Sequence, residues 1–362
     1  MVIAPLFCVF FFTSLMGDGL PLKLPVGAVD LDHSAVSRTV IRSLGSFEQT
    51  RIVGHYSDVA QARRAIQRGE IYGFFFIPRA TAEKAISSRQ PTISFYSNYS
   101  YLIAGSLIYR DMRTMSELTG GSLSRQTLYA KGATMDQTMA ILQPVVIETH
   151  ALGNPWMNYA VYLCNTLIPG VLGLMVMMVT VYSIGVEIKQ RTARRWLVLS
   201  GRSMRVALLG KLLPHLIVFS LIAVFYNFYL YQVLHFPCHG GLGGMIASSL
   251  LFVMASQGLG VVFISLLPSL RLGLSSCSLL GVVSFSISGF SFPVMAMDPT
   301  LQGLSWLFPL RHYFLIYVNH ALHGFSPIYA WTNYLSLIIF CFLPLLTLKM
   351  LKKALVVAPY KM

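Results

Sequence analysis

Charged residues are scarce in this chain. Only 11% of its 362 residues are Asp, Glu, Lys or Arg, whereas 55% are hydrophobic. Carboxylic acids are scarcest in the second half, where Glu187 and Asp298 are the only ones after Met157. Together with a mean hydropathy of +0.64, this composition excludes an ordinary water-soluble enzyme. It predicts a polytopic α-helical membrane protein.

Recognisable catalytic motifs are also missing. The sequence contains no Gly-x-Ser-x-Gly elbow, no His-Glu-x-x-His, no paired Cys-x-x-Cys and no P-loop. Four of its five cysteines lie inside apolar runs, so no disulfide framework is indicated. We therefore predict that the chain has no catalytic residue and no bound cofactor or metal ion.

Two groups of residues carry side chains that can bind a metal ion and would contradict that prediction if they did so. Asp30, Asp32 and His33 are neighbours, but Asp-x-Asp at a strand end more often makes turn and cap hydrogen bonds. His320 and His323 lie one helical turn apart, but no third ligand is evident near them. Neither group is sufficient for a metal site.

Apolar runs predict six membrane spans. The first, at residues 2–16, rises only about 22 Å as a helix and is short for a hydrocarbon core of about 30 Å, so we expect a cytosolic lead-in to precede it. The other five runs cover residues 158–184, 206–234, 243–267, 273–297 and 331–348. These limits define a first transmembrane segment at 1–18 and a five-helix membrane domain at 156–362.

Basic residues at the ends of these spans set the expected orientation. The net charge of +14 forms no dense patch, so it does not indicate nucleic-acid binding. Residues 189–211 and the C-terminal lysines carry most of the positive charge of the apolar half and should face the cytosol. Both termini are then cytosolic, whereas residues 19–155 and an outer re-entrant hairpin at 290–330 are external.

Residues 19–155 have the composition of a water-soluble α/β domain. Ser34 and Ser57 are expected helix N-caps, Gly69 a helix C-cap, and Gly120-Gly121 an interruption of the longest helix. The expected strands cover 25–30, 51–56, 72–77, 92–96 and 143–149, and the expected helices 34–44, 58–68, 81–88 and 101–130. The fold class is thus a six-helix membrane protein with an inserted extracytoplasmic α/β domain.

Residues 185–206 form a charged island within the apolar half. Charges at the centre of a bilayer cost about 2.5 to 3.5 kcal/mol each, so this stretch must be a wet loop between spans. Its candidate functional residues are Glu187, Lys189, Arg191, Thr192, Arg194, Arg195 and Trp196.

Several short motifs occur in one order along nearly the whole chain. In the apolar half they are Ile168-Pro169-Gly170, Glu187 with Thr192, Gly210-Lys211 with Pro214, Gly289 to Pro293, and Pro309 to Phe314 with Gly324. In the α/β domain they are Val29 to Arg38 and Gly69 to Pro78. This series resembles the permease subunits of ABC exporters of the ABC-2 type. Arg191 departs from the family pattern, because the family usually has Gly in this coupling motif.

The resemblance implies a transport subunit that works with others. ATP and Mg²⁺ would bind to separate ABC ATPase subunits, which would push on residues 185–206. A second copy or a close relative would complete the pathway, and a periplasmic adaptor protein is a further expected partner. The implied location is a bacterial inner membrane with its lipids, and the implied cargo a drug-like, lipidic or other amphipathic substrate.

Two sets of residues within the spans have both a purely structural and a functional interpretation. Small side chains recur along one face of the fifth span, which favours static helix packing or a seam between two protomers. They are Gly273, Cys277, Gly281, Ser284, Ser288 and Ser291. Asn165 and Asn227 are polar groups in other spans and are candidates to line a substrate path.

Two other functions remain open from the sequence. The spans could merely anchor an external α/β domain that senses a ligand or serves as a scaffold. A secondary carrier is less favoured, because no carboxylate lies in mid-membrane to couple transport to protons or sodium. Association with an ATPase would separate the exporter from the anchored sensor.

Overall fold

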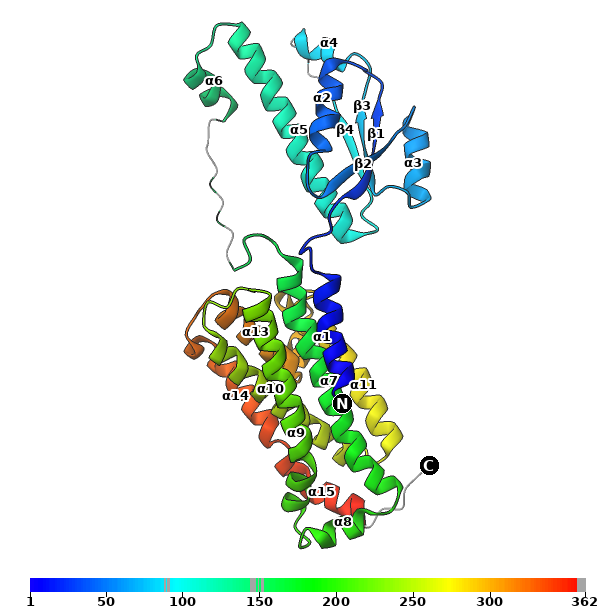
Figure 1. The fold of residues 1–362 in the computed structure, drawn as a ribbon, viewed down its shortest axis with the longest axis vertical. Coiled ribbons are helices and arrows are strands. Elements are labelled where there is room, and N and C mark those ends of the chain that lie inside the picture. Colours follow the sequence, from blue (N-terminus) through cyan, green and yellow to red (C-terminus); the bar gives the residue numbers. More distant parts are fainter. Residues whose placement is uncertain (88, 90–91, 144–147, 149, 151–152, 357–362) are drawn as a thin grey trace. The chain divides into compact units, whose positions relative to one another are not determined.

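The computed structural model describes residues 1–87, 89, 92–143, 148, 150 and 153–356 (Figure 1). The chain divides into two compact units. One unit is Leu20–His150, and the other combines Met1–Gly19 with Ala151–Met362. The first is an α/β sheet domain and the second is helical.

The α/β domain is built on a mixed sheet. Its strands are β1 (Leu24–Asp30), β2 (Thr50–His55), β3 (Gly73–Ile77) and β4 (Ser94–Ser97). The order is β2-β1-β3-β4, with β1 parallel to both β2 and β3, and β4 antiparallel to β3. Its helices are α2 (Ala35–Leu44), α3 (Val59–Gln67), α4 (Thr81–Ile86), α5 (Leu102–Ala130) and α6 (Met135–Leu142).

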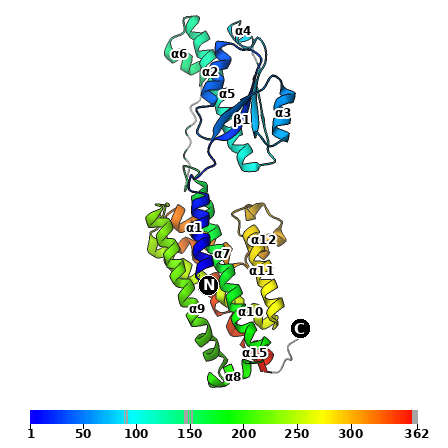
Figure 2. The same cartoon turned by 45° about the vertical axis from the view of Figure 1, so that its right-hand side comes forward.

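Both faces of this sheet are covered by helices. Val26 and Phe75 pack with Leu44 of α2 and Ile108 of α5 on one face. Val29 and Phe74 pack with the alanines of α3 on the other, and Figure 2 shows α3 across the sheet from α2. Strands buried on both faces read as continuous apolar runs, which explains Gly73–Ile77.

Two of the three helix caps expected in the α/β domain lie where the sequence predicts them. Ser34 accepts a hydrogen bond from the Ser37 amide, as predicted, and Gly69 has a φ of +74° just after the α3 cap. The Ser57 prediction was wrong by one residue, because Asp58 is the N-cap of α3 and accepts from the Gln61 amide.

Two predictions for the end of the α/β domain had different outcomes. The expected break at Gly120-Gly121 is wrong, because α5 continues through both glycines to Ala130. Residues 144–147 and 149 of the expected strand at 143–149 lie outside the described residues, and α6 precedes them unpredicted.

Among its described residues, the helical unit has five helices long and apolar enough to cross a membrane. They are Tyr159–Lys189, Met204–Val233, Leu242–Leu266, Leu270–Ile287 and Pro327–Val356. Helix α1 (Ile3–Leu15) is apolar but has only 13 residues, and its Val9 is buried among residues of α7 (Tyr159–Lys189) and α9 (Met204–Phe228). The chain is therefore a helical membrane protein with an α/β domain before its long spans.

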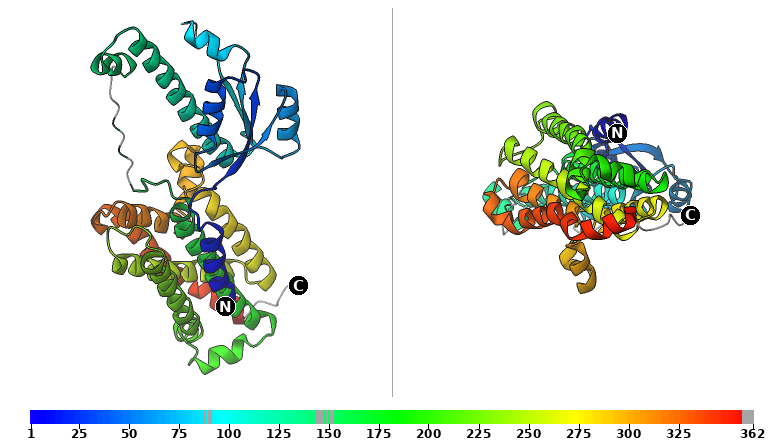
Figure 3. Two further views of the ribbon diagram at one scale, coloured as in Figure 1. Left: turned by 45° about the horizontal axis from the view of Figure 1, so that its top comes forward. Right: turned by 90° about the horizontal axis from the view of Figure 1, so that it is seen from below.

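Helix α10 (Leu242–Leu266) lies inside the bundle. It packs against α7, α9, α13 (Pro309–Tyr317) and α14 (Trp331–Phe342), and Figure 3 shows the bundle end-on. Small residues allow these contacts, since a Cβ on Gly260 would lie 3.0 Å from the Met177 carbonyl oxygen of α7. Such close backbone approach is typical of membrane helix packing.

The span expected at residues 273–297 is shorter in the structure. Helix α11 (Leu270–Ile287) ends before Gly289, whose φ of +102° suits only glycine. Pro293 follows, and the chain continues as η2 (Val294–Ala296) and α12 (Pro299–Ser305). Asp298 caps α12, because its carboxylate accepts the Thr300 amide at 2.9 Å.

The last span is assembled from shorter helical pieces. Before this span, α13 continues as η3 (Val318–Leu322). The span itself begins with η4 (Pro327–Ala330), which leads into α14. Pro344 then begins α15 (Pro344–Val356). A proline cannot donate to the carbonyl four residues earlier, so the Phe340 carbonyl is freed at this junction.

Candidate functional site

The charged island of the sequence forms a tight turn between two helices. Helix α7 ends at Lys189, and α8 (Ala193–Leu199) starts just after the turn. The Thr192 amide donates to the Glu187 carbonyl at 3.0 Å, and the Arg191 amide to the Ile188 carbonyl at 3.3 Å. This pair of bonds is the Schellman arrangement, which requires a left-handed residue between them.

Arg191 occupies that left-handed position. Its φ is +60°, a conformation that glycine adopts without cost and other residues adopt rarely. The departure of Arg191 from the family's Gly therefore leaves the turn intact but places a side chain where a glycine is favoured.

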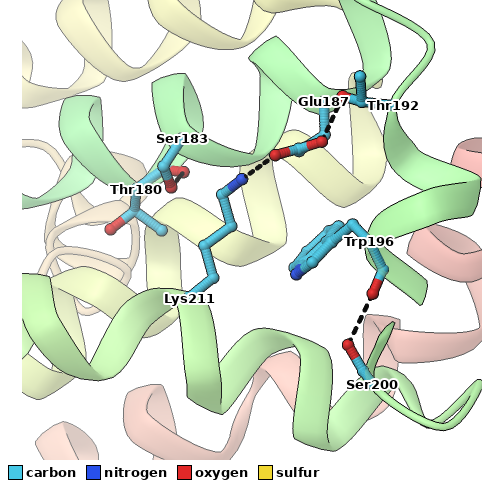
Figure 4. A network of polar contacts seen from close by, with 7 residues as sticks. All are labelled: Thr180, Ser183, Glu187, Thr192, Trp196, Ser200 and Lys211. Atoms are coloured by element: carbon cyan, nitrogen blue, oxygen red, sulfur yellow. Dashed lines mark hydrogen bonds and ion pairs between the residues drawn. The ribbon is translucent and has the colours of Figure 1, made fainter. Parts of the chain in front are cut away.

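Glu187 links three elements at this turn (Figure 4). One carboxylate oxygen accepts from the Lys211 ammonium of α9, and the other accepts from the Thr192 hydroxyl. The Glu187 and Lys211 side chains are only 20% and 21% exposed. Water therefore screens this ion pair less than it screens a fully exposed pair.

Trp196 adds an aromatic contact to this group. The Lys211 ammonium lies 4.9 Å from the centre of the Trp196 ring, which is cation-π distance. Lys211 thus contacts both the end of α7 and the middle of α8. Sequence reasoning missed Lys211 as a site residue, since 24 residues separate it from Glu187.

Helix α8 is also held to the C-terminal helix. The Arg194 guanidinium donates to the Val356 carbonyl at 3.4 Å, and the Lys352 ammonium donates to the Arg202 carbonyl at 3.1 Å. Ala193 and Leu197 are buried at 3% and 4% exposure. Displacing α8 would therefore pull on α7, α9 and α15 together.

The other side of α8 is exposed and apolar. Val198 and Leu199 are 63% and 80% exposed, and Arg195 is exposed beside them. Adjacent exposed apolar residues rimmed by charge are typical of a protein interaction site. In the sequence, this surface belongs to the apolar run Leu197-Val198-Leu199. Only Leu197 of the three is buried in the structure. Lys189 and Arg191 are exposed on the preceding turn.

The small-residue face of α11 packs within the chain. A Cβ on Gly273 would lie 2.8 Å from the Val181 side chain of α7, and a Cβ on Gly281 would meet Leu174 of the same helix. Cys277 and Ser284 are also buried, as is Ser288 at the helix C-cap, whereas Ser291 lies beyond the end of α11, is exposed and does not share this helical face. The packing interpretation thus describes this face in a single chain, and a seam with a second copy stays a prediction.

Asn165 and Asn227 belong to two buried groups of hydrogen-bonded side chains. The Tyr231 hydroxyl donates to Asn165 at 2.7 Å, and the Asn227 amide nitrogen donates to the Ser249 hydroxyl at 2.8 Å. The Tyr226 hydroxyl also donates to Ser249 at 2.8 Å. Both asparagines are at most 2% exposed. Their role along a substrate path stays a prediction.

An apolar cleft lies between α9, α10 and the α14–α15 junction. Its volume is about 290 Å³, and its lining includes Leu212, Leu216, Met254 and Leu348. Arg205 also lines it. The cleft can accommodate an apolar chain or ring and presents one cation to it.

The carboxylates that suggested a metal site have other partners. Asp30 accepts the amides of Asp32 and His33, both at 3.0 Å. Asp32 accepts the Thr81 and Ala82 amides at 2.8 and 3.2 Å, which ties β1 to the start of α4. The turn-and-cap interpretation is confirmed, and the described residues contain no group of three metal-ligand side chains.

Comparison with known proteins agrees with the motif order. The family described as ABC-2 family transporter protein matches residues 1–348. "Probable multidrug ABC transporter permease YbhR" of Escherichia coli K12 is 26% identical over 163 residues, which cover 44% of this chain and 43% of that protein. The protein of the same name from E. coli O157:H7 matches to the same extent.

These alignments span less than half the length of the curated relatives. The family match, in contrast, covers nearly the whole chain and includes both the α/β domain and the long helices. The chain therefore belongs to the ABC-2 family of transporter proteins, as a membrane permease subunit that is not itself catalytic.

Proposed function

We propose that this chain is one transmembrane half of an ATP-driven exporter. The sequence contains no P-loop, so ATP and Mg²⁺ would bind to a separate ABC ATPase subunit. Two permease chains, either identical or closely related, would enclose the pathway. ATPase closure would then reach this chain as a mechanical push on residues 185–206.

The contacts of Glu187 are the observation that carries this proposal. Through Lys211 and Thr192, this one carboxylate joins α7, α9 and the start of α8. An element tied to two spans moves them together when it is pushed, which is how small displacements become rigid-body motion. The contacts with the ATPase would come from Val198, Leu199, Arg194 and Arg195. Trp196 and Lys211 would pass the displacement of α8 on to α9.

The proposed topology has six spans and an external α/β domain. Helix α1 would be the first span, with both chain termini in the cytosol and Leu20–His150 in the periplasm of a bacterium. The cluster of cations at the α7–α8 turn supports a cytosolic position for that turn. An external domain of this size also suits contact with a periplasmic adaptor protein.

The proposed substrate is a drug-like, lipidic or other amphipathic molecule, taken from the cytoplasm or the inner membrane. The relative YbhR is named as a probable multidrug permease, which supports this class of substrate. The apolar cleft of about 290 Å³ with Arg205 in its lining suits an amphipathic molecule or a lipid. Transport of candidate compounds into inside-out vesicles is the direct measurement.

Glu187→Ala and Arg194→Glu test the coupling role. Both should weaken co-purification with the ATPase and reduce ATP-dependent export several-fold, because one loosens the turn and the other reverses a contact charge. Arg63→Glu, an exposed change on α3 of the α/β domain, is the matched control. If both site variants export and bind ATPase like the control, the coupling role is wrong, whereas an unmodified chain that neither exports nor binds ATPase would favour an anchored sensor.

The seam between two copies can be tested just beyond the C-terminal end of α11. Ser291 is exposed, so Ser291→Cys in a chain without its native cysteines should form an intermolecular disulfide on mild oxidation in membranes. Tyr182→Cys on α7 is an exposed control away from that face. Equal cross-linking at both positions would exclude a specific seam at α11.

A further inference from the structure

The α/β domain contains a hollow at the carboxyl ends of its parallel strands. It measures about 800 Å³. The ends of β1 and β2, residues of α2 from its first to its last turn and the segment after β3 all contribute to its lining. Ligands of open parallel sheets bind at this edge, where the loops after neighbouring strands converge.

The lining of this hollow is strongly cationic. Arg38 and Arg42 reach it from α2, and Arg79 reaches it from the segment after β3. His33 and His55 lie at the ends of β1 and β2. Among the described residues, no carboxylate lies within ion-pair distance of any of these three guanidinium groups.

Asp30 does not neutralise this charge through direct pairing. It is the only carboxylate in the described lining, and its oxygens accept the backbone amides of Asp32 and His33 and the Ser37 hydroxyl. The Arg38 guanidinium donates to the His33 carbonyl at 3.1 Å, which fixes one arm of its fork beside the hollow. A positioned guanidinium with free donors is suited to phosphate or carboxylate.

The hollow also has an apolar component. Leu31 and Ile41 line it together with Tyr56. The Tyr56 ring lies over two strands, since a Cβ on Gly27 would come within 2.6 Å of it and a Cβ on Gly54 within 3.0 Å. These glycines leave room for the ring, and its packing gives the hollow an aromatic wall.

We propose that this hollow binds a small organic anion, in which a phosphate or carboxylate group is attached to an apolar or aromatic body. The three arginines would hold the anionic group, while Tyr56, Leu31 and Ile41 would contact the body. The volume falls within the range of about 300 to 1,000 Å³ typical of small-molecule sites. This site lies wholly within the α/β domain and requires no ATPase.

Phenyl phosphate is a suitable probe because it combines the two features. The full chain would be reconstituted in phosphatidylcholine nanodiscs, which carry no anionic lipid, and titrated by calorimetry. Saturable binding is expected, tighter for phenyl phosphate than for inorganic phosphate or for benzyl alcohol. It should also weaken as ionic strength rises.

Arginine variants then locate the site. Arg38→Gln with Arg42→Gln should weaken phenyl phosphate binding by about tenfold or more, because charge-assisted hydrogen bonds are lost. Arg63→Gln with Arg64→Gln removes the same charge from exposed positions of α3 and should leave affinity unchanged. These glutamines replace exposed side chains, so the fold should survive in both pairs.

Three results would overturn the proposal. The first is the absence of saturable phenyl phosphate binding to the unmodified chain. The second is equal weakening by the two arginine pairs, which would show a general charge effect. The third is binding of benzyl alcohol as tight as that of phenyl phosphate, which would remove the anionic requirement.

Discussion

Arg191 holds a backbone conformation that glycine would hold more easily. Its φ of +60° places it in the left-handed region, where a side chain costs about 1 to 2 kcal/mol. We predict that Arg191→Gly preserves the α7–α8 turn, whereas Arg191→Val opens it, because a β-branched residue is a severe outlier there. Hydrogen exchange of the Thr192 amide in the full chain measures this opening.

The control for this prediction is Arg195→Val. Arg195 is exposed and lies in α8, where valine costs only a few tenths of a kcal/mol in helix propensity, at most about 0.7. If valine at both positions speeds exchange of the Thr192 amide equally, the left-handed residue is not what makes the turn sensitive.

Asp111 is a buried acid in the α/β domain. It is 3% exposed, one oxygen lies 3.8 Å from the Arg110 guanidinium, and the other has no hydrogen-bond partner among the described residues. Burial raises the pKa of Asp111, and the Arg110 charge opposes this only in part. The folded state therefore favours the protonated acid, so its contribution to stability is full at low pH and is lost as pH rises through the folded pKa.

Asp111→Asn should accordingly stabilise the α/β domain at neutral pH. The expected gain is about 1 kcal/mol, the lower end of the cost of an unsatisfied buried group. The gain should vanish below about pH 4, where Asp is protonated in the unfolded chain as well. Thermal unfolding across this pH range is the measurement. Asp136→Asn, at an exposed position in the first turn of α6, should give no such gain.

Among the elements, those determined by neighbouring residues were predictable from the sequence. The Ser34 cap depends on Ser37, three positions away, and was predicted correctly. The Asp298 cap is equally local, since it depends on Thr300 two positions away. Helix α6 was missed although its signal was present, since Thr134 and Gln137 form a capping box before an apolar run.

Features that depend on packing were less predictable. The ion pair between Glu187 and Lys211 requires α7 and α9 to be adjacent, which spacing along the chain does not specify. The Gly120-Gly121 prediction failed for a related reason. Glycine in a helix costs about 1 kcal/mol, but the longer helix α5 tolerates both without a break. The charge of residues 185–206 marked them as a candidate site, whereas their ion pair with α9 could not be predicted.

The contact between α10 and α14 should be unusually sensitive to one methyl group. A Cβ on Gly258 would collide with the Phe340 carbonyl oxygen, which Pro344 frees from its helical hydrogen bond. That atom belongs to the backbone and cannot rotate away. Gly258→Ala should therefore destabilise the membrane unit by about 3 kcal/mol, the upper end for overpacking.

Gly210→Ala is the matched control for this change. Gly210 lies within α9, and a Cβ there would have nothing within 4 Å, so alanine should stabilise the helix by up to about 1 kcal/mol. Thermal unfolding in detergent compares the two variants. Opposite signs are expected, and similar small effects would show that α14 can shift away from α10.

For the whole molecule, we predict on which side of the membrane the α/β domain and the α7–α8 turn lie. Cations gather at the α7–α8 turn, and the positive-inside rule places that turn in the cytosol. Helix α7 lies between that turn and the α/β domain, so one crossing by α7 leaves Leu20–His150 outside. Helix α1, which has only 13 residues, decides only on which side the N-terminus lies.

Single cysteines in a chain without its native cysteines decide this question. A membrane-impermeant maleimide added to intact cells should label Ser46→Cys in the α/β domain and should not label Gln190→Cys at the turn, both being exposed positions. Permeabilised cells should show labelling at both. Labelling of both positions in the same compartment would mean that α7 does not place the α/β domain and the turn on opposite sides, and would overturn this topology. If that compartment were the cytosol, the hollow lined by Arg38, Arg42 and Arg79 would meet cytosolic anions instead of external ones.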